Sequence, residues 1–326
     1  MVFMAESQLK DPYVNKSGHL DVGDGHKIYY EDWGNPKATA VMHLHGGPGG
    51  GFSESHKLIY DPEVHHVIFH DQRGCGRSTP FAEVKNNTTQ HLIADIEKLR
   101  KHLKTDKVFV AGGSWGSTLT MLYAIAHPEN VEKIMMWGIF LLRQFEIYYL
   151  YQGVAKQTLP EAWDRFISLV PAKDRGSSMG VINFYASKIQ SKDEKTAMKY
   201  AAEWNLWESS TVSITYDKEQ TEREVLGGDE KQQKFNLAIA RMESHYFQNN
   251  CFVPENAILK NIDKIKHIPA YVVQGRFDLC TPPISALDLA KAYGKNLNLQ
   301  IVAAGHLRSE GEVRAVLRTF ASTVLV

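Results

Sequence analysis

Residues 112–116, which read GGSWG, constrain the fold of this chain more than any other stretch. The apolar run at residues 108–111 predicts a buried strand before them, and residues 118–124 predict a helix after them. Glycines two positions before and two positions after Ser114 allow a turn that is too tight for side chains. A serine in such a turn takes strained dihedrals that lift its hydroxyl clear. The pattern therefore predicts a serine nucleophile at a strand-to-helix junction.

The segments on either side of this turn predict an α/β fold. Residues 27–33, 40–44 and 64–69 are typical of strands, and residues 88–103 are typical of a helix. A further strand is predicted at residues 133–137. Because strands that alternate with helices are joined by right-handed crossovers, we expect a mainly parallel sheet flanked by helices.

A long helical stretch interrupts this alternation. Between residues 142 and 260 the sequence predicts helices and almost no buried strand. These helices are residues 161–169, 180–190, 194–209 and 232–247. Strands return at residues 270–273 and 297–302, each followed by a helix. We therefore predict a catalytic α/β domain of residues 1–141 and 261–326, with a helical cap domain of residues 142–260 inserted after the sixth strand.

The composition argues against several kinds of partner. The 37 basic and 37 acidic residues cancel, so we expect no basic face for nucleic acid or an anionic membrane. Cys75, Cys251 and Cys280 are too few and too far apart for a disulfide framework, which favours a reducing compartment. The first residues lack a signal-peptide pattern, and the longest apolar run, residues 134–142, is too short to span a bilayer. We expect a cytoplasmic protein.

Two polar residues follow the last two predicted strands. A serine hydroxyl needs a base that takes its proton, and the base needs a third group that holds it in one tautomer. Asp278 follows one strand and His306 follows the other. The order serine, aspartate, histidine resembles that of α/β hydrolases and differs from those of chymotrypsin and subtilisin. The sequence thus predicts a catalytic triad of Ser114, Asp278 and His306. The alternative interpretations are that Asp278 is an ordinary turn aspartate and that His306 is a surface histidine.

A glycine-rich loop at residues 45–51 follows the early strand at 40–44. Backbone amides in such a loop can stabilise the negative charge that develops on a carbonyl oxygen in the transition state. We assign the amides of Gly47 and Trp115 as the two donors of this oxyanion hole. The competing interpretation, a phosphate-binding loop, lacks the lysine ending and the GxGxxG spacing.

Other polar segments are interpreted as structural. No glutamate or cysteine lies at ligand spacing from the five histidines His43, His45, His65, His66 and His70, so we expect no metal site. The turn at residues 71–78 carries an aspartate and two arginines, which we expect to brace neighbouring loops. Cys75 and Cys280 are expected to be structural thiols near the site.

These segments together resemble proline iminopeptidases, which are serine peptidases with the α/β-hydrolase fold. The resemblance spans roughly residues 15–310 and is carried by residues 45–49, 71–78, 112–119, 138–143, 204–208, 240–247, 274–278 and 304–306. The motifs in the cap are more specific to this family than those in the sheet. The resemblance implies removal of an N-terminal proline from peptides without a cofactor.

The resemblance also implies a substrate site in the cap. Two cap glutamates of the family bind the free imino terminus of the peptide, and they fall on Glu208 and Glu243. The proline-ring pocket falls on Phe140, Leu150 and Phe247, beside Trp115. A protonated secondary amine has two N–H donors, which two carboxylates can accept. The sequence departs from the family pattern at Leu150, Trp137, Leu307 and Arg308. We expect these departures to affect substrate preference more than mechanism.

The sequence therefore predicts a serine aminopeptidase that releases N-terminal proline through an acyl-enzyme. Its expected partners are peptides with a free N-terminal proline. The alternatives are a carboxylesterase or small-amide hydrolase with the same triad, and a non-catalytic binding protein on this scaffold. The accepted peptide length, other N-terminal residues and the oligomeric state stay open.

Overall fold

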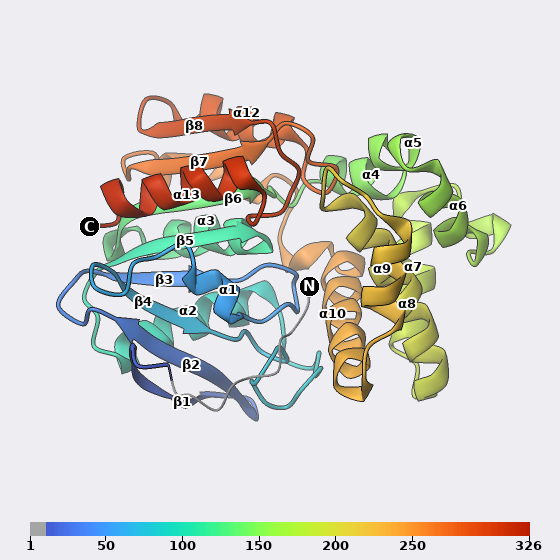
Figure 1. Ribbon diagram of the computed structural model, residues 1–326, viewed down its shortest axis with the longest axis horizontal. Helices are drawn as coiled ribbons and strands as arrows, with labels where there is room; N and C mark the ends of the chain where they lie inside the picture. Colours follow the sequence, from blue (N-terminus) through green and yellow to red (C-terminus); the bar gives the residue numbers. More distant parts are fainter. Residues whose placement is uncertain (1–10) are drawn as a thin grey trace.

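The computed structural model describes residues 11–326 as an eight-stranded sheet with helices on both faces and a helical cap at one end (Figure 1). The first ten residues, which hold the segment without a signal-peptide pattern, lie outside the described residues. The strands are β1 (Val14–Gly23), β2 (His26–Gly34), β3 (Ala40–Leu44), β4 (His66–His70), β5 (Val108–Ser114), β6 (Val131–Ile139), β7 (Ala270–Gly275) and β8 (Leu297–Val302).

The strands lie in the order β1-β2-β4-β3-β5-β6-β7-β8. Strand β2 runs antiparallel to both of its neighbours, while every pair from β4 to β8 in this order is parallel. The predicted fold class, a mainly parallel sheet flanked by helices, is therefore confirmed. Because the carboxyl ends of parallel strands share one edge of the sheet, the loops after β3, β5, β7 and β8 meet there.

Strand β1 was not predicted from the sequence. It is an edge strand on which Val22 is fully buried while most other positions are partly or fully exposed. The run is too polar to match the pattern of a buried strand. Its partner β2 is the more buried of the two and was predicted.

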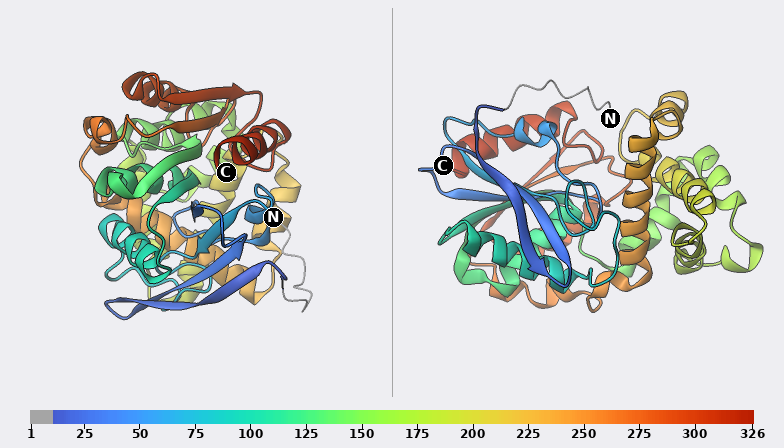
Figure 2. Two further views of the ribbon diagram at one scale, coloured as in Figure 1. Left: turned by 90° about the vertical axis from the view of Figure 1, so that its left-hand side faces the viewer. Right: turned by 90° about the horizontal axis from the view of Figure 1, so that it is seen from below.

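The helices divide between the two faces of the sheet (Figure 2). One apolar cluster joins the sheet to α2 (Thr89–His102), α3 (Trp115–Ala126) and α12 (Pro283–Tyr293). A second cluster, on the other face, joins it to α13 (Gly311–Val324) and to Phe52, Ile59 and Tyr60, which flank α1 (Glu54–Lys57). The first cluster continues into the cap without interruption. The cap and the sheet thus share one core.

The cap lies between β6 and β7 in the chain and packs beside α3 and the loops of the sheet (Figure 1). Its helices are α4 (Gln144–Tyr151), α5 (Val154–Thr158), α6 (Pro160–Ser168), α7 (Ser178–Ile189), α8 (Glu194–Thr211), α9 (Lys218–Leu226) and α10 (Glu230–Gln248), and the short helix α11 (Ala257–Lys260) leads back to the sheet. The predicted cap helices correspond to α6, α7, α8 and α10. We propose the domain division after residues 141 and 260 because β6 ends at Ile139 and β7 begins at Ala270.

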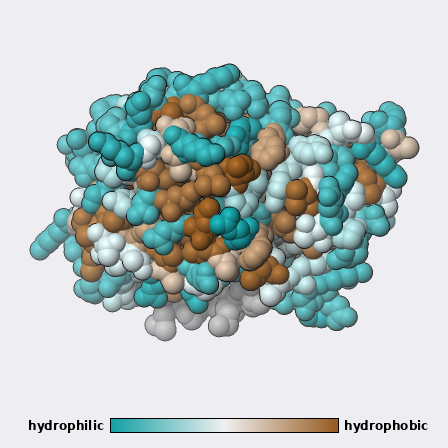
Figure 3. All heavy atoms as spheres, turned by 90° about the horizontal axis from the view of Figure 1, so that it is seen from above, coloured by the Kyte–Doolittle hydropathy of each residue, from teal (hydrophilic) through white to brown (hydrophobic). Residues whose placement is uncertain are grey.

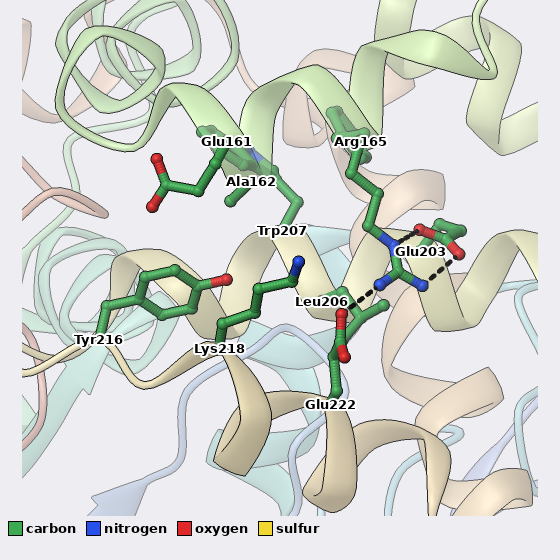
Figure 4. A pocket seen from close by; sticks show the side chains of 10 residues that line it. Glu161, Ala162, Arg165, Glu203, Leu206, Trp207, Tyr216, Lys218 and Glu222 are labelled. Atoms are coloured by element: carbon green, nitrogen blue, oxygen red, sulfur yellow. Dashed lines mark hydrogen bonds and ion pairs between the residues drawn. The ribbon is translucent and has the colours of Figure 1, made fainter.

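Charged contacts tie three of the cap helices together (Figure 4). Arg165 of α6 forms ion pairs with Glu203 of α8 at 2.7 Å and with Glu222 of α9 at 2.6 Å. These side chains border a cavity of about 40 Å³ beside Trp207 and Lys218. A cavity of this size holds water molecules but not a peptide. We interpret it as part of the cap's packing.

The face seen from above shows apolar side chains in its middle and polar side chains around them (Figure 3). Exposed apolar residues of the molecule include Phe277 and Ile284. Within residues 11–326, every helix lacks either the length or the apolar character needed to cross a bilayer.

Candidate active site

Ser114 lies at the junction of β5 and α3 with a φ of 57° and a ψ of −126°. A non-glycine residue with positive φ is strained, and such strain often marks functional positions. The flanking glycines are required by close backbone contacts: a Cβ on Gly116 would lie 2.1 Å from the carbonyl oxygen of Leu44, and one on Gly112 would lie 2.4 Å from that of Gly116. The steric reason for the glycines, expected from the sequence, is therefore present.

Asp278 and His306 come from the loops after β7 and β8 and meet side by side. The Nδ1 atom of His306 lies 2.8 Å from Oδ2 of Asp278. Asp278 also accepts the backbone amides of Cys280 at 2.9 Å and Thr281 at 2.7 Å. The side chains of Thr281 and Gln274 donate to its Oδ2 at 2.9 and 3.0 Å. These donors fix the carboxylate, which in turn fixes the orientation of the imidazole ring.

The electrostatics of His306 suit a base that must carry a proton. Burial by itself lowers the pKa of the imidazole, but the charge and the hydrogen bond of Asp278 outweigh burial and raise that pKa well above 6.5. Gly138 backs the ring closely, since a Cβ there would lie 2.8 Å from its Cε1 atom. Ser114 and His306 line the same cavity. The hydrogen bonds between residues 11 and 326 do not include one joining these two side chains, and such bonds often tighten only with substrate.

The loop after β3 lies against the nucleophile turn. A Cβ on Gly46 would lie 3.4 Å from the Cβ of Ser114, and Gly47 has a φ of 116° that favours glycine. Gly46 and Gly47 both line the cavity. Trp115 is the first residue of α3, where backbone amides have no acceptor inside the helix. Both backbone segments proposed as oxyanion donors therefore lie next to Ser114.

The indole of Trp115 lies beneath the site rather than in its wall. It is fully buried, donates from Nε1 to Oε1 of Gln72 at 3.0 Å and packs on Tyr246. Gln72 in turn donates from its backbone to Nε2 of His45 at 3.0 Å. Through these contacts the turn at residues 71–78 braces both the nucleophile helix and the glycine loop. That bracing role agrees with the expectation from the sequence.

Two cap glutamates face the same cavity. Glu208 is on α8 and Glu243 is on α10, and both line the cavity together with Ser114. The hydroxyl of Tyr151 donates to Glu208, and Nε1 of Trp204 donates to Glu243 at 2.7 Å. Neither carboxylate forms an ion pair with a basic residue in the described part of the chain. A buried and a half-buried carboxylate therefore line the same cavity as Ser114, with no ion-pair partner among residues 11–326.

Burial dominates the titration of these glutamates. It raises the pKa of Glu208 from 4.5 to about 7. Burial, together with the negative charge of Glu208, raises the pKa of Glu243 well above its ordinary value. The pKa of Glu208 rises because burial removes its negative charge from water, and the pKa of Glu243 rises for that reason and because a like charge lies nearby. A bound cation would relieve both effects.

The three apolar residues assigned to the ring pocket are buried, and none of them is among the residues that line this cavity. Phe140, Leu150 and Phe247 are each less than 10% exposed. Phe247 packs on Phe140 and Tyr151, while Trp137 lies in the cavity wall itself. An added Cβ on Gly113 would lie 1.9 Å from Nε1 of Trp137, so the indole covers the nucleophile turn directly.

Several contributing residues were not found from the sequence. Tyr151 donates a hydrogen bond to Glu208, and Thr281 donates one to Asp278 of the proposed triad. His56 and Arg308 line the cavity. Arg308 was noted as unusual, which was the one available signal. The others have no motif because their roles depend on packing. The cavity has a volume of about 330 Å³, at the small end of the range for ligand pockets.

Comparison with known proteins gives consistent matches. A family model described as alpha/beta hydrolase fold matches residues 39–311. The proline iminopeptidase of Arabidopsis thaliana is 42% identical over 308 residues, covering 94% of this chain and 78% of that protein. A proline iminopeptidase of Neisseria meningitidis is 41% identical over 301 residues, covering 92% of each chain. A thermophilic esterase from Thermogutta terrifontis superposes with a TM-score of 0.64 at 16% identity, covering 94% of this chain and 97% of that one, which shows the shared fold alone.

Proposed function

Since this chain belongs to the proline iminopeptidase family of α/β hydrolases, we propose that it is a serine aminopeptidase that releases N-terminal proline from peptides. One observation carries the proposal: buried Glu243 and half-buried Glu208 line the cavity that also holds Ser114, and no basic residue among 11–326 forms an ion pair with either. Buried charges are costly unless paired, so a site of this kind favours a positively charged ligand. A protonated proline terminus supplies that charge.

The two glutamates would fix where the peptide begins. The secondary ammonium of an N-terminal proline has two N–H donors, and each carboxylate accepts one. The hydrogen bonds from Tyr151 and Trp204 hold the carboxylates in place. Because the cation must be the free terminus, the enzyme acts as an exopeptidase. The apolar cluster of Phe140, Leu150 and Phe247 supports this end of the site from behind.

The sheet would supply the reaction. Ser114 attacks the carbonyl carbon of the terminal proline, and His306 takes the hydroxyl proton as the bond forms. Asp278 stabilises the imidazolium, and the amides of Gly47 and Trp115 stabilise the oxyanion. His306 then gives the proton to the leaving amine, which departs as the shortened peptide. Water, deprotonated by His306, hydrolyses the prolyl ester and restores Ser114.

The three free cysteines of the chain fit a reducing compartment, so the cytoplasm is the proposed location. The equal numbers of acidic and basic residues support peptides, rather than nucleic acid or membrane, as partners.

Steady-state kinetics with a prolyl anilide and its N-acetyl derivative tests the proposal. Acetylation removes the charge and both N–H donors while leaving the scissile bond unchanged. We expect the acetylated compound to be turned over at least about 100-fold more slowly in kcat/KM, which corresponds to the loss of a buried charged contact. Equal turnover of the two compounds would contradict the proposal and favour a general esterase or amidase.

A further inference from the structure

The cavity beside Ser114 also carries two nitrogen donors that the mechanism does not use. Arg308 lies two residues after His306, and His56 is on α1, and both line the cavity. They come from the sheet part of the molecule, whereas Glu208 and Glu243 come from the cap. The cavity thus has acidic groups on its cap wall and basic groups on its sheet wall.

Arg308 is a half-buried cation in the cavity wall that has no carboxylate partner among residues 11–326. Its guanidinium donates to Oγ of Ser55 at 2.5 Å, and among residues 11–326 it forms no ion pair. Burial lowers the pKa of this guanidinium to about 10, so it stays charged at neutral pH. A cation that has lost part of its water shell and has a single neutral partner is stabilised when an anion joins it. The hydrogen bond from Arg308 to Ser55 on α1 does not by itself account for a charged residue at position 308, because a neutral donor could bind Ser55 equally well.

His56 adds a second donor next to this charge. Its Nδ1 atom accepts the backbone amide of Ser53 at 3.0 Å, so we assign the ring proton to Nε2. Burial, and then the charge of Arg308, lower the pKa of His56 well below 6.5, so the ring is neutral. Among residues 11–326, the hydrogen bonds of the His56 ring all involve Nδ1, which leaves Nε2 to donate to a ligand. Because Ser55 precedes His56 on α1, the hydrogen bond from Arg308 keeps the two donors together.

We propose that Arg308 and His56 form a carboxylate subsite for the part of the peptide that leaves. This inference rests on the proposed function, since it takes Glu208 and Glu243 as the site of the imino terminus. The carboxylate is either the C-terminus of a prolyl dipeptide or an acidic side chain at the second position. A prolyl dipeptide carries a positive and a negative end, which the two walls of the cavity match.

The size of the cavity agrees with such a substrate. Its volume of about 330 Å³ is at the lower limit for ligand pockets. A ligand held at both ends in this space is short. Opposite charges at the two ends would also fix its direction, so that the scissile bond lies between the glutamates and Arg308 in the cavity that Ser114 also lines.

Four substrates test the subsite and separate the two sources of the carboxylate. Pro-Ala and Pro-Ala-amide differ only in the terminal carboxylate, while Pro-Glu-amide and Pro-Gln-amide differ in a side-chain carboxylate. We expect the wild type to prefer the carboxylate of at least one pair in kcat/KM. Arg308→Gln should lower that preference by about tenfold, and Arg308→Lys should keep part of it. The pair that responds identifies the source.

The matched control is Arg314→Gln, because Arg314 is an exposed arginine on α13. It should leave both preferences as in the wild type. If Arg308→Gln turns over the amides and has the same two preferences as the wild type, the subsite is refuted while the peptidase function stands. If the wild type does not hydrolyse any of the four prolyl substrates, the proposed function itself fails. Thermal unfolding of each variant confirms that it is folded.

Discussion

The two walls of the cavity are built in different ways. In the sheet wall, Ser114 ends β5, and Asp278 and His306 lie on the loops after β7 and β8, where hydrogen bonds hold them. In the cap wall, Glu208 lies in the last turn of α8 and Glu243 lies in the C-terminal half of α10. One wall depends on loop geometry at the edge of a sheet, and the other depends on how helices pack against it.

The walls also differ in how their charges are balanced. In the sheet wall, Asp278 has His306 and four further donors around it. In the cap wall, each glutamate has one neutral donor and a second carboxylate nearby. The many donors around Asp278 hold its carboxylate in one orientation. The cap glutamates have few donors, so a ligand of opposite charge would stabilise them. We therefore infer that the sheet wall carries out the reaction and that the cap wall selects the substrate.

Removal of the proposed nucleophile should lower activity more than any other change, and it should do so on prolyl and neutral substrates alike. Ser114→Ala is expected to lower kcat by about 10⁴-fold or more on every substrate, including neutral esters, because the acyl-enzyme can no longer form. Activity assays on a prolyl anilide and on a small ester measure this. Ser187→Ala, an exposed serine on α7, serves as control. Retention of ester activity in Ser114→Ala would place that chemistry elsewhere.

Neutralising the cap wall should have a smaller and selective effect. Glu208→Gln and Glu243→Gln are expected to lower kcat/KM for a prolyl anilide by about 100-fold each, because a buried charged contact with the imino terminus is lost. Turnover of a neutral acetate ester should change by only a few-fold. Glu194→Gln, at an exposed position of α8, should behave as wild type on both. Parallel losses on both substrates would show that the two walls are not separable.

The smallest expected effect concerns stability and runs in the opposite direction. Burial raises the pKa of Glu208 from 4.5 to about 7, so folding favours its protonated form. Its contribution to stability is fully present below pH 4.5 and is lost as the pH rises through about 7. Glu208→Gln cannot ionise, so it should be more stable than wild type at pH 8 by about 1–2 kcal/mol and similar at pH 5.

Urea unfolding at the two pH values measures this difference. Glu219→Gln is the control, since the side chain of Glu219 on α9 is 87% exposed. A variant that is less stable than wild type at pH 8 would mean that the ionised carboxylate is satisfied in the fold. The interpretation that Glu208 needs a bound cation to stabilise its ionised form would then be wrong.

Much of the sheet wall could be predicted from the sequence. Its residues follow strands at fixed positions, and the glycines around Ser114 are required by contacts with Leu44 and with the turn itself. The edge strand β1 and the short cap helices α4, α5 and α9 were missed, because their apolar patterns are weak or short. The cap glutamates were found only through the resemblance to a family, since a glutamate on a helix is usually solvated.

The sequence by itself determined the parallel sheet, the cap insertion and the residues of the proposed triad, because local spacing and strand order dictate them. The tertiary structure alone decided which charges are left without a partner. The hydrogen bonds of Tyr151 and Trp204, the position of Trp115 beneath the site and the unpaired guanidinium of Arg308 all arise from contacts between distant segments. Desolvation depends on everything that surrounds a group, so no local pattern encodes it.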